Sequence, residues 1–242
     1  MKFSVLTLFP EFFDALRNYS IIGRAIEEEK IQLETVNIRD FSGNKHGQVD
    51  DYSYGGGPGM VMQPGPIYQA IESVKNENSK VVFLSPQGKV LTQEKLNELS
   101  KLDHLVLLNG HYEGIDNRII ENYIDEEISL GDFVMTGGEV ASMAIIDGVT
   151  RLIPGVLASA ESYESESHYN GILEFPQYTR PQSFKGFDVP DVLLSGNHKK
   201  IEQYRIYQSI KVTLEKRPDL IDRSKLSDLE NKYLTDILNE GR

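Results

Sequence analysis

The sequence predicts an α/β fold, a parallel sheet covered by helices, followed by a small α-helical domain. Two observations predict it. Short apolar runs alternate with helix-period segments over the first 158 residues, a rhythm typical of a parallel sheet with helices on its faces. After residue 171 the alternation stops and two long helix-period segments follow. The 242 residues are enough for one large domain or two modest ones.

The elements of the first domain follow from apolar periodicity and turn residues. Apolar runs predict strands at residues 3–9, 81–84 and 105–108, and a clean alternation of apolar and polar residues predicts one at 31–38. Four helices are expected among them: one opened by Pro10 with Phe12, Phe13, Leu16 and Ile22 as its apolar positions, one over 67–74, one capped by Thr92 and one over 139–151. The expected boundary of this α/β domain is residue 158.

Residues 159–171 differ in composition from the rest of the chain. They hold four Ser and three Glu and only tyrosine as apolar bulk, which predicts a flexible linker. The remaining residues, 172–242, predict an α-helical domain with helices over 199–216 and 226–239. The first of these helices has Ile201, Tyr204, Tyr207, Ile210 and Leu214 on one face, a stripe typical of a core contact.

Composition excludes several classes of protein. Without cysteine the chain can form no disulfide, thiol nucleophile or zinc–thiolate site, which fits a reducing cytoplasm. No apolar segment reaches 18 residues and no signal-peptide pattern opens the chain, so we expect a soluble cytoplasmic protein without membrane contact.

Charge gives two opposed indications about a nucleic-acid partner. The net charge of −12 argues against binding a polyanion. Residues 172–242, however, carry 12 basic and 11 acidic side chains, and 196–217 holds six bases against two acids. Such a basic stripe is compatible with RNA binding and equally with a solvated helix face.

Four glycine-rich clusters are the strongest indication of a site. They lie at 54–60, 84–88, 109–114 and 130–139, and three of them directly follow an expected strand. Ligands bind outside the carboxyl ends of parallel strands, and glycine lets backbone approach a ligand. One such loop alone is more often a plain turn, but three together predict a pocket suited to an adenine and a ribose. The P-loop, dinucleotide, H-E-x-x-H and G-x-S-x-G motifs are absent.

These residues closely resemble the bacterial tRNA (guanine-N1)-methyltransferases, the TrmD family of the SPOUT class. The similarity runs nearly end to end and is carried by the following segments: Leu8-Phe9-Pro10, Arg39-Asp40-Phe41, Val49-Asp50-Asp51, Tyr54 to Met60, Leu84 to Gly88, Gly110 with Tyr112 to Asp116, Gly131-Asp132, Gly137-Gly138-Glu139, Arg151 to Gly155, Tyr178 to Pro181 and Leu193 to His198.

The resemblance implies a fold, a reaction and an assembly. The fold would hold a deep trefoil knot in the α/β domain, with S-adenosylmethionine bound in it. The reaction would methylate N1 of the guanosine immediately 3′ to the anticodon of tRNA. The protein would be a homodimer in which each site draws on both subunits. Magnesium is implied too, with Glu113 and Glu166 available as oxygen ligands but no ligand set assigned.

Carried over position by position, the resemblance assigns the cofactor-binding residues to three of the glycine-rich loops. They are Leu84, Ser85 and Pro86 in the first; Gly110, Tyr112, Glu113 and Gly114 in the second; and Leu130, Gly131, Asp132, Phe133, Val134, Met135, Gly137 and Gly138 in the third. His46 and Asp50 also match the family pattern, in a loop where a structural role is equally expected.

Two residues are expected to carry the catalysis. Arg151 matches the family's catalytic arginine, which would stabilise charge growing on guanine O6. Glu166 stands where the family has the aspartate expected to act as general base, with Glu164 as an alternative. The extra methylene of glutamate departs from the family pattern, as does Ala158 in place of a glycine. Tyr178 to Arg180 and the 196–217 stretch are candidate contacts to the anticodon stem-loop.

Two other functions are compatible with parts of the sequence. A SPOUT-type enzyme that methylates a ribose 2′-hydroxyl would need no base poised at guanine N1. An RNA-binding module with impaired catalysis would be supported by the change to Glu166 alone.

Overall fold

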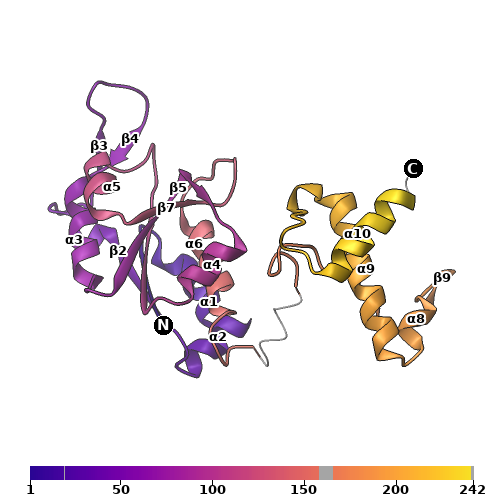
Figure 1. Cartoon of the computed structure of the whole chain (residues 1–242). Helices are drawn as coiled ribbons and strands as arrows, with labels where there is room; N and C mark the ends of the chain where they lie inside the picture. Colours follow the sequence, from indigo (N-terminus) through magenta and orange to yellow (C-terminus); the bar gives the residue numbers. More distant parts are fainter. Residues whose placement is uncertain (19, 158–165, 241–242) are drawn as a thin grey trace. The chain divides into compact units, whose positions relative to one another are not determined.

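The computed structural model describes residues 1–18, 20–157 and 166–240. The chain divides into two compact units, Met1–Ser159 and Ala160–Arg242, and each is described by itself. The first unit is built on a five-stranded sheet, in which every neighbouring pair is parallel (Figure 1). In spatial order its strands are β2 (Gln32–Asn37), β1 (Lys2–Thr7), β6 (His104–Asn109), β5 (Ser79–Val90) and β7 (Glu126–Ser129).

Helices cover both faces of this sheet, as the β-α rhythm predicted. One face carries α3 (Pro64–Val74) and α5 (Asn117–Tyr123), and the other carries α1 (Asp14–Asn18), α2 (Ser20–Glu27), α4 (Gln93–Leu99) and α6 (Glu139–Thr150). Successive strand side chains point to opposite faces. In β6, Leu105 and Leu107 therefore join one apolar cluster, whereas Val106 and Leu108 join the other. All four are fully buried.

Several elements differ from the expectation for the first unit. The helix opened by Pro10 is a 3₁₀ turn, η1 (Pro10–Phe13), followed by α1 and α2. Phe13 is buried there, but Phe12 is 47% exposed. The strand β7 reads Glu-Glu-Ile-Ser and was not predicted, because an edge strand with one apolar residue has no strand-like pattern. Also unforeseen were α5, the turn η2 (Ile38–Phe41) and the hairpin of β3 (Asp50–Tyr52) and β4 (Met60–Met62).

The second unit is mainly helical, and its two expected helices are confirmed as α9 (His198–Lys216) and α10 (Asp228–Glu240). They contact each other through the rings of Tyr207 and Tyr233, whose centroids are 5.6 Å apart. Of the five apolar residues predicted to form the stripe on α9, only Ile210 is fully buried and the other four are half-buried. A small unit has little interior to offer, so this partial burial is expected.

Short elements complete the second unit: α8 (Asp191–Leu194), η3 (Pro218–Leu220) and a two-stranded ribbon of β8 (Ser183–Phe184) and β9 (Phe187–Asp188). Residues 158–165 lie outside the described part of the chain. They include Ala158, the first seven residues of the expected linker and, among these, Glu164. Within the described ranges, no helix has both the length and the apolar character needed to cross a membrane.

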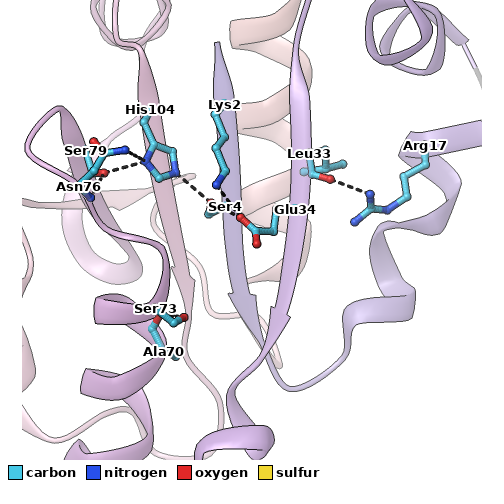
Figure 2. Close-up of polar contacts among 10 residues, drawn as sticks. All are labelled: Lys2, Ser4, Arg17, Leu33, Glu34, Ala70, Ser73, Asn76, Ser79 and His104. Atoms are coloured by element: carbon cyan, nitrogen blue, oxygen red, sulfur yellow. Dashed lines mark hydrogen bonds and ion pairs between the residues drawn. The ribbon is translucent and has the colours of Figure 1, made fainter. Parts of the chain in front are cut away.

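A row of polar side chains crosses four strands at the amino edge of the sheet (Figure 2). His104 is buried, with Nε2 2.9 Å from Ser4 Oγ and Nδ1 2.7 Å from Ser79 Oγ. Ser4 donates to Glu34 Oε2 at 3.1 Å, and Lys2 pairs with the same carboxylate at 2.8 Å. Because Ser4 gives its proton to Glu34, a neutral His104 donates from Nε2 and accepts at Nδ1.

We predict that this row makes the first unit sensitive to acid. Burial lowers the pKa of His104, Lys2 lowers it further and Glu34 opposes both, so the pKa lies below its usual value. The unfolded chain then takes up a proton near pH 6.5 while the native chain does not, and stability falls as the pH drops below that value. His104→Gln removes a slope of at most about 1.4 kcal/mol per pH unit. Denaturant unfolding at pH 5.5 and 8 measures it, and an unchanged slope contradicts the prediction.

Candidate functional site

Three loops at the carboxyl edge of the sheet enclose a cavity of about 240 Å³. The first is an excursion within β5, the second and third follow β6 and β7, and the third leads into α6. All but two of the fifteen residues expected to bind cofactor line this cavity: Leu84, Ser85, Pro86, Gly110, Tyr112, Glu113, Gly114, Leu130, Phe133, Val134, Met135, Gly137 and Gly138. The structure thus brings together loops that are up to 54 residues apart in the sequence.

The two expected residues outside the lining are Gly131 and Asp132. Gly131 instead shapes the turn, since its N–H donates to Ser129 Oγ at 3.1 Å and its carbonyl accepts from the same hydroxyl at 3.0 Å. Asp132 is exposed. Six lining residues were not predicted: Phe83, His111, Ile128, Ser129, Thr136 and Ala141. His111 and Thr136 lie inside two of the glycine-rich clusters, and Phe83 and Ser129 directly precede a cluster, whereas Ile128 and Ala141 lie two positions beyond one.

The first loop is an excursion within β5. Leu84 and Lys89 both align with Ile128 of β7, so the four residues between them leave the ladder and return to the same partner. Ser85 stabilises this excursion by accepting the N–H of Gln87 at 3.1 Å. A side chain at Gly88 would come within 2.5 Å of the backbone of β7, so only glycine lets the chain return so closely.

The second loop is fixed on one side by the β3–β4 hairpin. Glu113 donates its N–H to the Met60 carbonyl at 3.0 Å, and the Gly114 carbonyl accepts from Met62 at 2.9 Å. Tyr112 adopts a positive φ of 59° and Gly114 one of 127°, conformations that turn the chain sharply. The glycine cluster at 54–60 forms the tip of this hairpin, where Tyr54 is fully exposed.

The start of α6 closes the third side of the pocket through a buried carboxylate. Glu139, at the first position of α6, is 4% exposed. It accepts from Thr7 Oγ1 at 2.6 Å and lies 2.9 Å from His111 Nε2 through both oxygens. Burial alone would raise the pKa of Glu139, but these hydrogen bonds outweigh it and hold the pKa below its usual range. The carboxylate is therefore charged at neutral pH and joins the ends of β1, β6 and α6.

A second buried polar group, the amide of Asn109, also joins β1, β6 and α6. Asn109, fully buried at the end of β6, donates from Nδ2 to the Leu6 carbonyl at 2.9 Å and accepts from Ser142 Oγ at 2.6 Å. Gly138 packs directly on it, because a Cβ there would lie 2.9 Å from Asn109. Close approach of α6 to β6 thus sets one wall of the pocket.

An open apolar surface adjoins the pocket across His111. It contains a recess of about 880 Å³, and the apolar residues Phe9, Phe12, Met135 and Val140 line this recess. Phe9, Phe12 and Val140 are 46%, 47% and 50% exposed, respectively. Large apolar side chains grouped in this way on a surface mark an interaction site. We call these four residues the apolar face.

Of the two expected catalytic residues, Arg151 lies away from the pocket within the α/β unit, and Glu166 belongs to the second unit. Arg151 caps the carboxyl end of α6, where its N–H donates to the Asp147 carbonyl at 3.2 Å. The pocket lies at the other end of this 12-residue helix, about 18 Å away at 1.5 Å per residue. Glu166 begins the described part of the second unit. The described residues contain no group of three or more His, Asp or Glu side chains able to hold a metal ion.

The pocket offers backbone N–H and C=O groups from glycine-rich turns together with apolar walls from Phe83, Leu84 and Ile128. Such walls suit a flat heterocycle, and the turns suit its polar edge and an attached sugar. The lining includes one exposed carboxylate, Glu113, but no lysine or arginine. The arrangement therefore suits a neutral or cationic nucleoside better than a nucleotide polyphosphate. This defines an α/β protein with a nucleoside-type pocket at the carboxyl edge of a parallel sheet.

Comparison with known proteins identifies the family. A family model described as "tRNA (Guanine-1)-methyltransferase TrmD" matches residues 1–223. Three curated relatives carry the name tRNA (guanine-N(1)-)-methyltransferase. The one from Ruminiclostridium cellulolyticum is 57% identical over 97% of this chain and 100% of its own. Those from Caldanaerobacter subterraneus subsp. tengcongensis and Finegoldia magna are 54% and 56% identical, over 97% and 92% of this chain and 97% and 96% of their own. The chain belongs to the TrmD family of tRNA (guanine-N1)-methyltransferases.

We predict that Gly138→Ala damages the pocket while leaving the fold in place. The backbone of Gly138, at φ −82°, is one that any residue can adopt. The substitution is therefore unfavourable only because the added Cβ would clash with Asn109. Displacing the start of α6 should weaken binding of S-adenosylmethionine, the expected ligand, about tenfold or more and cost about 1–3 kcal/mol of stability. Isothermal titration measures the first and denaturant unfolding the second.

The matched control is Gly65→Ala in the first turn of α3, where a Cβ meets nothing within 4 Å. It should bind the ligand as the wild type does. Equal affinities for the two variants would contradict the assignment of the α6 wall.

Proposed function

We propose that this chain transfers a methyl group from S-adenosylmethionine to N1 of the guanosine immediately 3′ to the anticodon of tRNA. The observation that carries the proposal is the gathering of three glycine-rich loops around one nucleoside-sized pocket in a chain of this family. The relatives named above carry the activity in their names.

The residues of the pocket fit S-adenosylmethionine by their chemistry. Apolar walls from Leu84, Ile128 and Leu130 suit the adenine, and backbone groups around Gly110 and Gly138 suit the ribose. Glu113, the one exposed carboxylate of the lining, suits the cationic end. When bound, this cofactor supplies an electrophilic methyl group.

Two side chains of the enzyme would prepare the guanine. N1 of neutral guanine carries a proton, and its lone pair becomes a nucleophile only when that proton leaves. We assign the removal of this proton to Glu166 and the stabilisation of the negative charge on O6 to Arg151. A fixed guanidinium accelerates the reaction because it acts where charge develops in the transition state.

The same proposal includes a homodimer in which a second copy supplies Arg151. Within one chain Arg151 is a helix length, about 18 Å, from the pocket, beyond the reach of an arginine side chain. The apolar face borders the same pocket and offers a surface for the second copy. We propose that two copies pair across this face and that Arg151 of one completes the site of the other.

The proposal also includes the knot, the location of the protein and its contacts to tRNA. The deep trefoil knot is supported by membership of the family, and a cytoplasmic location by the tRNA substrate. Since the described residues assemble no metal site, no step of this mechanism passes through magnesium. Among the basic side chains of α9, the exposed Lys199 and Lys200 are proposed to contact the tRNA backbone.

The proposed reaction predicts strict selectivity for the base. Purified protein with labelled methyl donor should modify a tRNA transcript with G after the anticodon and leave one with A there unmodified. Nucleoside analysis of the product should give N1-methylguanosine. Modification of both transcripts would indicate ribose methylation instead, and binding without transfer would indicate an RNA-binding module.

The proposed roles predict a loss of turnover without loss of cofactor binding. Arg151→Ala should lower kcat about 10²–10³-fold, and Glu166→Gln about 10²–10⁴-fold. Glu164→Gln is the matched control for the second change. If Glu164→Gln lost turnover and Glu166→Gln did not, Glu166 would not be the base.

The dimer is tested by mixing two impaired variants at a cofactor concentration too low to fill the weakened pocket of Gly138→Ala. Arg151→Ala keeps its pocket, and Gly138→Ala keeps its arginine. After subunit exchange a mixed dimer holds one complete site if Arg151 acts across the interface and none if it acts within its own chain. Recovery of methyl transfer on mixing is the expected result, and its absence in a verified mixed dimer contradicts the proposal.

A further inference from the structure

The second unit contains a recess of about 520 Å³ that is separate from the cofactor pocket. It lies between residues 175–182, the short helix α8 and the first turns of α9. Its volume falls in the range of small-molecule sites. Every residue that lines it belongs to the second unit, so the recess does not depend on how the two units are placed.

The floor of the recess is apolar and its rim is cationic. Phe175, Leu193 and Ile201 are half-buried on the floor. Arg180 and Arg205 are exposed at the rim, and the lining includes two glutamines but no acidic residue. The chain as a whole has a net charge of −12, whereas the lining of this recess carries two positive charges and no negative one. It therefore suits an anionic ligand with an apolar part.

Phe175 and Arg205 add a feature that suits a flat ligand. The guanidinium carbon of Arg205 lies over the ring of Phe175, 4.9 Å from its centroid. Such a contact restrains a flexible side chain and leaves the outer face of a planar guanidinium open for stacking. Unpaired bases of RNA stack on guanidinium planes and aromatic rings in this way.

A nucleotide combines the properties that the recess suits. Its base is flat and can rest on the stacked pair, and its phosphate matches the second guanidinium. Gln182 offers a donor and an acceptor for the base edge, whereas the Gln177 amide donates to Glu174. An acidic peptide would also be attracted by the two arginines, but it would leave the stacked surface unused. The geometry therefore favours a nucleotide.

We propose that this recess binds one unpaired nucleotide of the tRNA, other than the guanosine that is methylated. The base lies against the Phe175–Arg205 pair and the phosphate beside Arg180. The inference rests on the proposed function and extends it, because it gives the second unit a site of its own for recognising the anticodon loop.

The first experiment compares Arg205→Gln with the matched control Arg223→Gln, which removes the same charge from an exposed residue outside the recess. In steady-state methylation of a tRNA transcript, Arg205→Gln should raise KM for tRNA about tenfold and leave kcat and cofactor affinity unchanged. Arg223→Gln should behave as the wild type. Equal KM values for the two variants would overturn the inference.

The second experiment asks whether Arg205 holds a base or only a phosphate. Transcripts with an abasic site at each position of the anticodon loop are tested with the wild type, Arg205→Gln and Arg205→Lys. At one position the abasic site should raise KM for the wild type and have no further effect on either variant, because the stacking is already lost. Additive effects at every position would overturn the inference.

Different results would overturn the proposed methyl transfer and the proposed nucleotide site. A wild-type protein that does not methylate the intact transcript would overturn the proposed function, and this inference with it. A wild-type protein that methylates it, with Arg205→Gln indistinguishable from Arg223→Gln, would overturn the inference alone.

Discussion

The geometry of the pocket depends on one buried charge. The carboxylate of Glu139 lies where β1, the loop after β6 and the start of α6 meet, and it is bound from two of these sides by Thr7 and His111. A buried charge is tolerated only when it is hydrogen-bonded. Removing Thr7 or His111 would therefore leave this buried charge with fewer hydrogen bonds and cost stability. Because Gly137 and Gly138 directly precede Glu139, the position of this carboxylate also fixes the turn that forms the pocket wall.

Much of the fold and the loops that line the pocket could be predicted from the sequence, but the contacts that hold these loops together could not. Apolar runs such as 105–108 showed the central strands, and strand ends followed by glycine located the pocket, because parallel strands end at a common edge. The strand β7 could not be predicted because it is mostly polar. The hydrogen bonds of β4 to the 110–116 loop could not be predicted either, because they join segments about 50 residues apart. Thr7 and Glu139 are 132 residues apart. No local pattern marks such a pair, and only the fold reveals it.

The two units divide the chemical tasks by their composition. The α/β unit has a pocket without lysine or arginine, suited to a nucleoside, whereas exposed arginines and lysines gather on the second unit around α9. An acidic body and a locally basic arm attract a polyanion at one place and repel it elsewhere. The apolar face borders the pocket of the α/β unit and is formed by uncharged side chains. Cofactor, nucleic acid and second copy would thus each meet a surface of different character.

The excursion in β5 has a consequence for how such a pocket can change over time. In an ordinary strand, one inserted residue turns every later side chain to the opposite face of the sheet. Here the ladder resumes at the partner where it stopped, since Leu84 and Lys89 share Ile128. Lengthening or shortening the four residues between them leaves both flanks in place. With glycine kept at position 88, the shape of this part of the binding site can therefore change without turning the core-facing side chains beyond it.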